Sequence, residues 1–151
     1  MTDVTLVAAC GSVTLVEGPN GSGRSTLLRI GAGVLDPGGG PVDVASEPPG
    51  RGAAAAVPAG DRMLLWRLTG RQNLEFIAAV GGRTKHKVLI EEVAESLLAG
   101  HLLDQPVAEL STGQRRSLTP AAGFVTGPPV LLLDELLSDL DESPARIPCR
   151  H

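Results

Sequence analysis

Aromatic residues are scarce in this sequence. It contains no tyrosine, one tryptophan and two phenylalanines, Trp66, Phe76 and Phe124. Basic residues are not in excess either, since 13 Lys and Arg stand against 17 Asp and Glu for a net charge of −4. Proteins that bind nucleic acid need a basic face and, for single strands, aromatic platforms on which bases stack. We therefore expect no nucleic-acid partner.

Cysteines and long hydrophobic runs are equally rare. Cys10 and Cys149 lie near opposite ends and lack the spacing of metal ligands, which argues against a disulfide framework and against a zinc site. No hydrophobic run approaches the ~20 residues that cross a bilayer. The N-terminus also lacks the basic start of a secretory signal. The sequence thus indicates a reduced, cytoplasmic chain that reaches the inner face of the membrane only through a partner.

The composition is that of one globular domain. The 151 residues have a hydrophobic fraction of 42%, which is sufficient for a core. Of the 19 glycines and 12 prolines, 6 Gly and 5 Pro fall within the 25 residues from 36 to 60, where we expect irregular structure. Within that stretch, residues 41–44 and 53–57 could form two short strands.

Helices and strands are predicted elsewhere from hydrophobic spacing and capping residues. A strand over residues 12–17 precedes a glycine-rich loop and a helix. Two capping boxes, Thr69 to Gln72 and Ser111 to Gln114, predict the starts of two further helices. The first should run to Val80, and the second should be disturbed at Pro120.

Residues 88–99 read as another helix, and residues 130–134 as a buried parallel strand. The helix should present Ile90, Val93, Leu97 and Leu98 to the core, with Gly100 as its C-terminal cap.

The strongest functional signal is the segment from Gly18 to Thr26. It fits the phosphate-binding pattern G-x-x-x-x-G-K-[ST] except that Arg24 replaces the lysine. Glycines let the backbone curl so that N–H groups and a helix N-terminus face one phosphate chain. This segment is predicted to contact the phosphates, and the Ser25 hydroxyl to bind Mg²⁺. Its residues are Gly18, Pro19, Asn20, Gly21, Ser22, Gly23, Arg24, Ser25 and Thr26.

A second signal is the pair of carboxylates at the end of the predicted strand 130–134. The carboxyl ends of parallel strands line the ligand crevice, so these groups could face the phosphate loop. Asp134 would hold Mg²⁺, and Glu135 would orient or deprotonate an attacking water as the catalytic residue.

Leu110 to Gln114, LSTGQ, lies between these two signals and carries a family resemblance. The sequence resembles the nucleotide-binding subunit of an ATP-binding cassette (ABC) transporter of the exporter type, shortened and diverged. LSTGQ is similar to that family's signature motif, residues 18–26 to its Walker A loop, VLLLDE to its Walker B strand and residues 138–141 to its D-loop.

The resemblance implies a fold, ligands and partners. The fold would be a P-loop α/β domain with a mostly parallel sheet and a helical signature subdomain over about residues 69–125, C-terminally truncated, within a single partial domain 1–151. The ligands would be ATP and Mg²⁺. The partners would be a transmembrane subunit and a second ATP-binding subunit, whose nucleotide is covered by Ser111, Thr112, Gly113 and Gln114.

Departures from the family pattern keep other interpretations open. Arg24 is broader than a lysine, Ala59 stands where the family has a glutamine, and the sequence ends before the family's switch histidine, for which His151 is a poor substitute. The chain could therefore be a nucleotide-binding module that does not hydrolyse ATP, or a decayed fragment. The transported substrate and its direction are not predicted.

Overall fold

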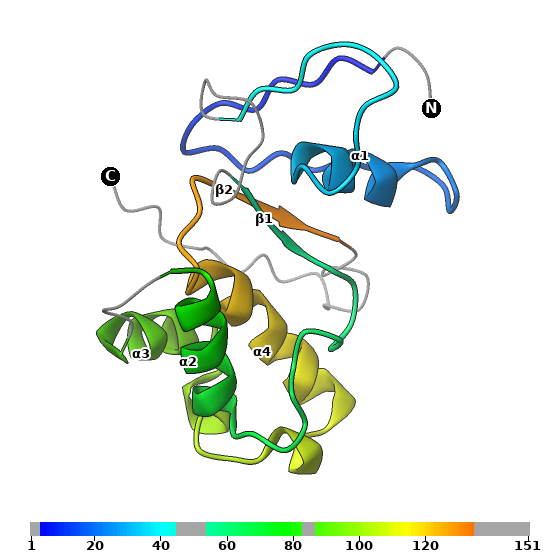
Figure 1. The fold of residues 1–151 in the computed structure, drawn as a ribbon. Coiled ribbons are helices and arrows are strands. Elements are labelled where there is room, and N and C mark those ends of the chain that lie inside the picture. The colour runs from blue at the N-terminus through cyan, green and yellow to red at the C-terminus, as the bar shows by residue number, and fades with distance from the viewer. Residues whose placement is uncertain (1–3, 45–53, 83–86, 135–151) are drawn as a thin grey trace.

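The computed structural model describes residues 4–44, 54–82 and 87–134. Helix α1 (Arg24–Gly31) is followed by strand β1 (Ala54–Val57), helix α2 (Gly70–Val80) and helix α3 (Lys87–Ser96). Two single-turn 3₁₀ helices, Gly100–Leu102 and Val107–Glu109, lead to helix α4 (Thr112–Phe124) and strand β2 (Val130–Leu133). Figure 1 shows α1 on one side of the strand pair and α2, α3 and α4 on the other.

The two strands pair in parallel, as predicted for residues 130–134. Ala54 lies opposite Val130 and Val57 opposite Leu133, and the N–H of Asp134 donates to the carbonyl of Val57 at 3.0 Å. Side chains alternate across the pair because successive strand residues point to opposite faces. Leu132 therefore contacts α1 and Leu131 contacts α4, where Gly123 leaves room for it. The sequence predicts a buried strand here, but all four β2 residues are half-buried.

The main hydrophobic core lies among the last three helices. Its buried members come from these helices and from the turns between them: Leu64, Leu74, Ala78, Ile90, Ala94, Ala99, Leu102, Leu103, Val107, Leu110, Leu118, Ala121, Ala122 and Val125. Close packing requires Gly70 at the start of α2, since a Cβ there would lie 2.6 Å from the carbonyl oxygen of Leu102. The helical part of the molecule thus has its own core, separate from the phosphate loop.

Both predicted capping boxes are confirmed. The Thr69 hydroxyl accepts from the N–H of Gln72 while the Gln72 side chain accepts from the N–H of Thr69. Ser111 and Gln114 make the same reciprocal pair at the start of α4. Each box satisfies two N–H groups that a helix start would otherwise leave without partners.

Pro120 is predicted to end α4 early or to kink it, and the early end is wrong. The helix continues through Pro120 to Phe124, and Ala121, Ala122 and Gly123 beyond it are buried. Burial of this last turn against the strands and the core outweighs the local cost of the proline, which has no N–H to donate to the preceding turn.

The predicted end of the third helix is also wrong. Helix α3 stops at Ser96, and Leu98 has φ 56° and is 84% exposed instead of facing the core. The N–H of Ala99 donates to the carbonyl of Ala94 and that of Leu98 to Glu95, which is the Schellman arrangement. Leu98 rather than Gly100 therefore occupies the left-handed position that ends the helix.

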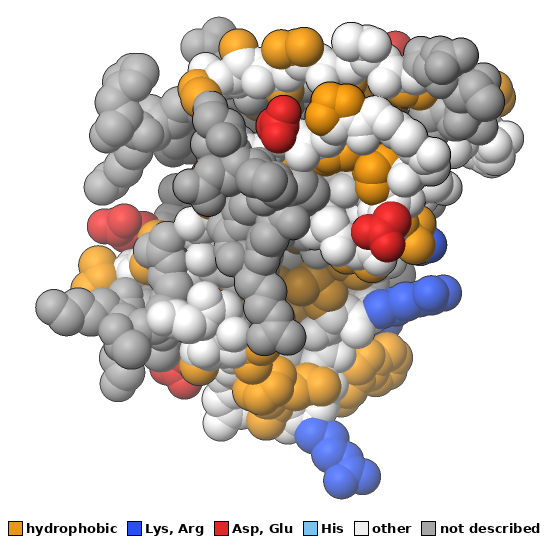
Figure 2. All heavy atoms as spheres, turned by 45° about the horizontal axis from the view of Figure 1, so that its top comes forward, with side chains coloured by type: hydrophobic (Ala, Val, Ile, Leu, Met, Phe, Trp, Pro, Cys, Tyr) orange, Lys and Arg blue, Asp and Glu red, His pale blue; other side chains and the backbone are white. Residues whose placement is uncertain are grey.

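The predicted strand over residues 12–17 is not formed. Val13 is 89% exposed and Leu15 is 65% exposed, and only Val16 in this segment is half-buried. Of residues 41–44, Val44 alone makes an isolated bridge, whereas residues 54–57 of the predicted 53–57 strand form β1. Strand propensity gives no ladder without a neighbouring strand, and the described sheet consists of β1 and β2 only. Large hydrophobic side chains consequently reach the surface, and Figure 2 shows several in orange on one face.

An exposed ion-pair group joins α2 to its neighbours. Arg71 donates to Asp104 at 2.9 Å and to Glu91 on α3 at 3.1 Å. The hydrogen bond from Arg71 lowers the pKa of the Asp104 carboxyl, and the same bond raises the pKa of Arg71. Because Asp104 is exposed, solvent screens this pair and it adds little stability.

Candidate functional site: a phosphate loop beside a carboxylate

The segment from Gly18 to Thr26 forms a tight loop that leads directly into α1. Gly21 has φ 81° and Gly23 has φ 96°, and both angles favour glycine because a Cβ is strained there. At Gly18 a Cβ would lie 2.8 Å from the Ser22 hydroxyl oxygen. The N–H of Ser22 closes a turn on the carbonyl of Pro19 at 3.1 Å. The backbone conformation of the loop therefore favours glycine at Gly21 and Gly23, whereas a Cβ at Gly18 would meet a side-chain hydroxyl that can rotate away.

The loop surrounds a polar hollow at the N-terminus of α1. Gly23 is the N-cap residue and has no side chain with which to cap the first-turn N–H groups. These groups and the helix dipole favour an anion at this end. The hollow has a volume of about 250 Å³, and its lining consists of Asn20, Gly21, Gly23, Arg24, Ser25 and Thr26. The site has the size and polarity to hold a phosphate chain.

Arg24 turns back onto the loop. Its Nη2 donates to Oδ1 of Asn20 at 3.2 Å. A lysine in this position would be a compact cation with three rotatable donors, whereas the guanidinium is broad and planar. The positive charge is kept at the hollow, but one arm of the fork is occupied by the loop itself.

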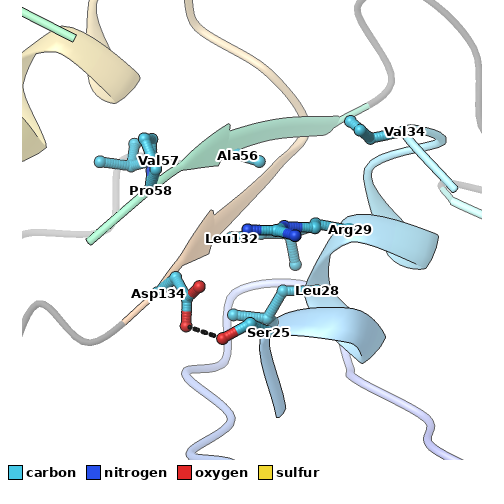
Figure 3. A pocket seen from close by; sticks show the side chains of 9 residues that line it. All are labelled: Ser25, Leu28, Arg29, Val34, Ala56, Val57, Pro58, Leu132 and Asp134. Carbon is cyan, nitrogen blue, oxygen red and sulfur yellow. Dashed lines mark hydrogen bonds between the residues drawn. The ribbon is translucent and has the colours of Figure 1, made fainter. Parts of the chain in front are cut away.

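The structure brings Ser25 and Asp134 together. The Ser25 hydroxyl, on the first turn of α1, donates to Oδ1 of Asp134 at 3.0 Å, although the residues are 109 positions apart. Asp134 reaches this place because it follows β2 directly and its N–H extends the ladder to Val57. Figure 3 shows the two side chains turned towards each other from α1 and from the end of β2. The predicted pairing of the loop with this carboxylate is observed.

A hydroxyl and a carboxylate in contact fit a magnesium site. Mg²⁺ prefers oxygen ligands and usually keeps several waters while it is held by one or two carboxylates and substrate phosphates. Within residues 4–44, 54–82 and 87–134, no cluster of three or more His, Cys, Asp or Glu could form an all-protein cage. The residues present therefore suit an ion shared with phosphate oxygens.

A second, mostly apolar hollow of about 170 Å³ lies next to this pair, between α1 and the strands. Its lining, drawn in Figure 3, consists of Ser25, Leu28, Arg29, Val34, Ala56, Val57, Pro58, Leu132 and Asp134. Pro58 belongs to the segment that leaves β1. The next residue, Ala59, is half-buried and has no side-chain atom that could coordinate an ion or a water.

The LSTGQ segment does not join the phosphate loop of its own chain. Ser111, Thr112 and Gly113 are exposed and Gln114 is half-buried at the start of α4. Figure 1 shows α4 and α1 on opposite sides of the strand pair. The two predicted halves of the nucleotide site are therefore separate within one chain.

Several predicted features lie outside the described residues. They are the catalytic residue Glu135, the segment 138–141 and His151. Their roles remain expectations from the sequence.

Sequence reasoning missed an ion pair beside LSTGQ. Arg115 pairs with Asp61, and its guanidinium carbon lies 4.6 Å from the centre of the Trp66 ring. Arg115 is adjacent to the motif, but no spacing rule connects it with a residue 54 positions away.

Comparison with known proteins agrees with this geometry. The family model described as ABC transporter matches residues 1–138. The chain is 35% identical over 150 residues to a cytochrome c biogenesis ATP-binding export protein of Rhizobium meliloti, covering 96% of this chain and 72% of the relative. It is 33% identical to a teichoic acids export ATP-binding protein of Bacillus cereus, covering 95% of this chain and 25% of the relative.

Solved structures resemble the fold. A putative ABC transporter ATP-binding protein from Pyrococcus furiosus superposes with a TM-score of 0.72 at 25% identity, covering 83% of this chain and 62% of that one. CbiO1 from Clostridium perfringens, part of the transporter complex cbiONQ, gives a TM-score of 0.67 at 27% identity, covering 82% and 54%. The chain thus spans a little over half of these two structures.

Along the chain, the phosphate loop comes first, LSTGQ second and the carboxylate after β2 third, which is the order of the family motifs that they resemble. The family match extends over nearly the whole chain. This protein belongs to the ABC transporter family, with the α/β fold of its ATP-binding subunits.

Proposed function

We propose that this chain binds ATP with Mg²⁺ in the loop from Gly18 to Thr26 and serves as an ATP-binding subunit of a transporter. The contact between the Ser25 hydroxyl and Asp134 carries the proposal, because it places a hydroxyl and a carboxylate beside a helix N-terminus. Bound Mg²⁺ would neutralise charge on the phosphates. The loop backbone would orient the phosphate chain, and the side-chain oxygens of Ser25 and Asp134 would bind Mg²⁺.

A second copy, or a related subunit, completes the site in this proposal. Ser111 to Gln114 lie on the far side of the strand pair from the loop, so they can act only on nucleotide held by another subunit. The positive end of the α4 dipole suits a γ-phosphate, although the Ser111 hydroxyl already accepts from the N–H of Gln114 there, unlike the uncapped start of α1. Glu135 is the proposed group that orients or deprotonates the attacking water.

The remaining partner is a transmembrane subunit. No helix in the described part of the chain is long and apolar enough to span a membrane. The similar proteins named above are export proteins, and the solved CbiO1 is part of a transporter complex. We therefore place the chain at the cytoplasmic face of a membrane through such a partner.

The dependence of ATP binding on Mg²⁺ tests the proposal. We would titrate ATP by calorimetry with Mg²⁺ and with EDTA, using wild type, Asp134→Asn and the control Asp36→Asn, which alters an exposed carboxylate that lines neither hollow. Wild type and the control should bind Mg-ATP more tightly than ATP alone. Asp134→Asn should lose most of that gain, about ten-fold or more for one charged ligand.

An Asp134→Asn variant with the full Mg²⁺ dependence of wild type would refute the assignment of this carboxylate. Failure of wild type to bind ATP in either buffer would refute the proposed function.

A further inference from the structure

Arg115, the first residue after LSTGQ, makes an unusually complete set of contacts. Its Nε donates to Oδ2 of Asp61, its Nη1 to the carbonyl of Leu110, and its Nη2 to the Thr112 hydroxyl at 3.3 Å. The Arg115 side chain is only 13% exposed, and that of Asp61 is 26% exposed. Charge-assisted bonds to a guanidinium fork fix direction as well as distance. Arg115 therefore grips the motif at Leu110, where it begins, and at Thr112, inside it.

Trp66 supplies a rigid platform for this arginine. The guanidinium carbon lies 4.6 Å from the ring centre, which is the geometry of a cation–π contact. The carbonyl of Trp66 accepts from the N–H of Ala108 at 3.0 Å. The preceding residue, Leu65, is held in both directions by the buried amide of Asn73, at 2.6 and 3.0 Å. The loop that receives Arg115 is thus itself immobilised.

The same loop begins at the phosphate site of its own chain. The carbonyl of Val57 accepts from the N–H of Asp134, and Pro58 lines the hollow beside Ser25. Asp61 follows within a few residues, and Figure 1 shows this green segment running alongside α4. Asp134 is therefore hydrogen-bonded to the end of β1, the chain runs on from β1 to Asp61, and Asp61 pairs with Arg115 at the start of α4.

We propose that Arg115 is a positioning residue: it clamps the N-terminus of α4 to the loop from Asp61 to Trp66, and so fixes the direction in which Ser111 and the first-turn N–H groups face ATP on a second copy. The part that concerns a second copy rests on the proposed function. The clamp itself needs no nucleotide, so the two can be tested separately. A clamp that sets direction needs the fork and the planar stacking of arginine, whereas a general stabilising charge could equally be a lysine.

The first test uses the free protein. We would compare wild type, Arg115→Lys, Arg115→Met and the control Arg116→Lys, which alters the exposed neighbouring arginine. Amide exchange at Gln114 and Arg115, whose N–H groups bond to Ser111, should become about ten-fold faster in both Arg115 variants. Exchange at Ala78 in the core of α2 should stay unchanged, which separates local loosening from general destabilisation.

The emission of Trp66 gives a second readout in the same samples, because Trp66 is the only tryptophan of the chain. Its emission should shift to longer wavelength when the guanidinium no longer covers the ring. Unchanged exchange at Gln114 and unchanged emission in Arg115→Met would overturn the proposal.

The second test measures Mg-ATP-dependent self-association by analytical ultracentrifugation. At protein concentrations below those at which copies associate, Arg115→Lys should bind Mg-ATP by calorimetry as wild type does, but at higher concentrations it should associate about ten-fold more weakly. Association of Arg115→Lys at wild-type strength would contradict the role towards a second copy. If wild type binds no ATP, the proposed function fails, while exchange and emission still decide whether Arg115 is a clamp.

Discussion

At the scale of single residues, Arg24 is the one fixed position at which the loop departs from the phosphate-binding pattern. The loop is shaped by its glycines for a phosphate chain, yet the one cation of the motif donates to Asn20. A guanidinium that donates to Asn20 should bind the terminal phosphates less strongly than a compact ammonium that points into the hollow.

We expect Arg24→Lys to tighten Mg-ATP binding by about three- to ten-fold, roughly 1 kcal/mol, since it restores a point charge that the loop geometry suits. Calorimetric titration of both proteins measures this directly. Arg29→Lys, an exchange in the neighbouring apolar hollow, is the matched control. Weaker binding by Arg24→Lys would mean that the guanidinium already lies well against phosphate.

Leu98 is strained in a way that can be measured. It occupies a left-handed conformation at φ 56° and is 84% exposed, so its side chain contributes little burial in return. We expect Leu98→Gly to raise the free energy of unfolding by about 1 kcal/mol, the usual cost of a side chain in that region.

Urea unfolding followed by circular dichroism checks this value. Leu97→Gly is the control and should lower the free energy of unfolding, because Leu97 packs against the core. A Leu98→Gly protein less stable than wild type would show that the contacts of the Leu98 side chain stabilise the fold by more than its backbone strain costs.

At the scale of elements, helix starts are predictable from this sequence, whereas strands are predicted correctly for β1 and β2 and wrongly for residues 12–17. The boxes at Thr69 and Ser111 act within one turn, so local residues suffice to place α2 and α4. The strand predicted at 12–17 has adequate propensity but requires a neighbour that no local pattern specifies. The conformation of Leu98 escapes prediction for a similar reason, since spacing alone cannot tell where a helix yields to a left-handed turn.

For the candidate site, too, some residues could be predicted from the sequence and others could not. The loop and Asp134 could be identified because each is a compact motif, and parallel pairing of β2 with β1 then brings them together. Asp61 and Arg115 could not, because their contact depends on how the loop after β1 packs against α4.

Pro120 supports a prediction about α4. The helix continues past it, so the missing hydrogen-bond donor is tolerated. Pro120→Ala should stabilise the protein by about 1–3 kcal/mol and raise the midpoint of thermal unfolding. The control Ala121→Gly, at the next and buried position, should lower it. A lower midpoint in Pro120→Ala would mean that the buried surroundings have adapted to the ring.

At the scale of the whole molecule, the proposed function makes turnover depend on groups from two subunits. Ser25 and Asp134 lie with the loop, whereas Ser111 and α4 lie beyond the strands. Ala59 offers no side-chain ligand where the family has a glutamine. Phosphoryl transfer is mainly a matter of positioning and electrostatics, so each missing group lowers the rate.

We therefore expect the isolated chain to hydrolyse Mg-ATP slowly or not at all at low concentration, with a specific activity that rises as copies associate. Phosphate release measured across a range of protein concentrations, for wild type and Glu135→Gln, checks this. Residual activity should vanish in Glu135→Gln. Fast release that is independent of protein concentration would contradict the expected need for a second subunit.

A titration of the loop from Gly18 to Thr26 decides whether this segment holds the phosphates of ATP. Mg-ATP is titrated by calorimetry into wild type and into Gly23→Asp, whose carboxylate would stand at the N-terminus of α1 and oppose the phosphates. Gly39→Asp is the matched control, because Gly39 is exposed and a Cβ added there would meet no atom within 4 Å. We expect wild type and Gly39→Asp to bind Mg-ATP, and Gly23→Asp to lose at least about 100-fold in affinity, from charge repulsion together with strain at φ 96°. Equal affinity of Gly23→Asp and wild type, with both proteins folded, would mean that this loop does not hold the phosphates.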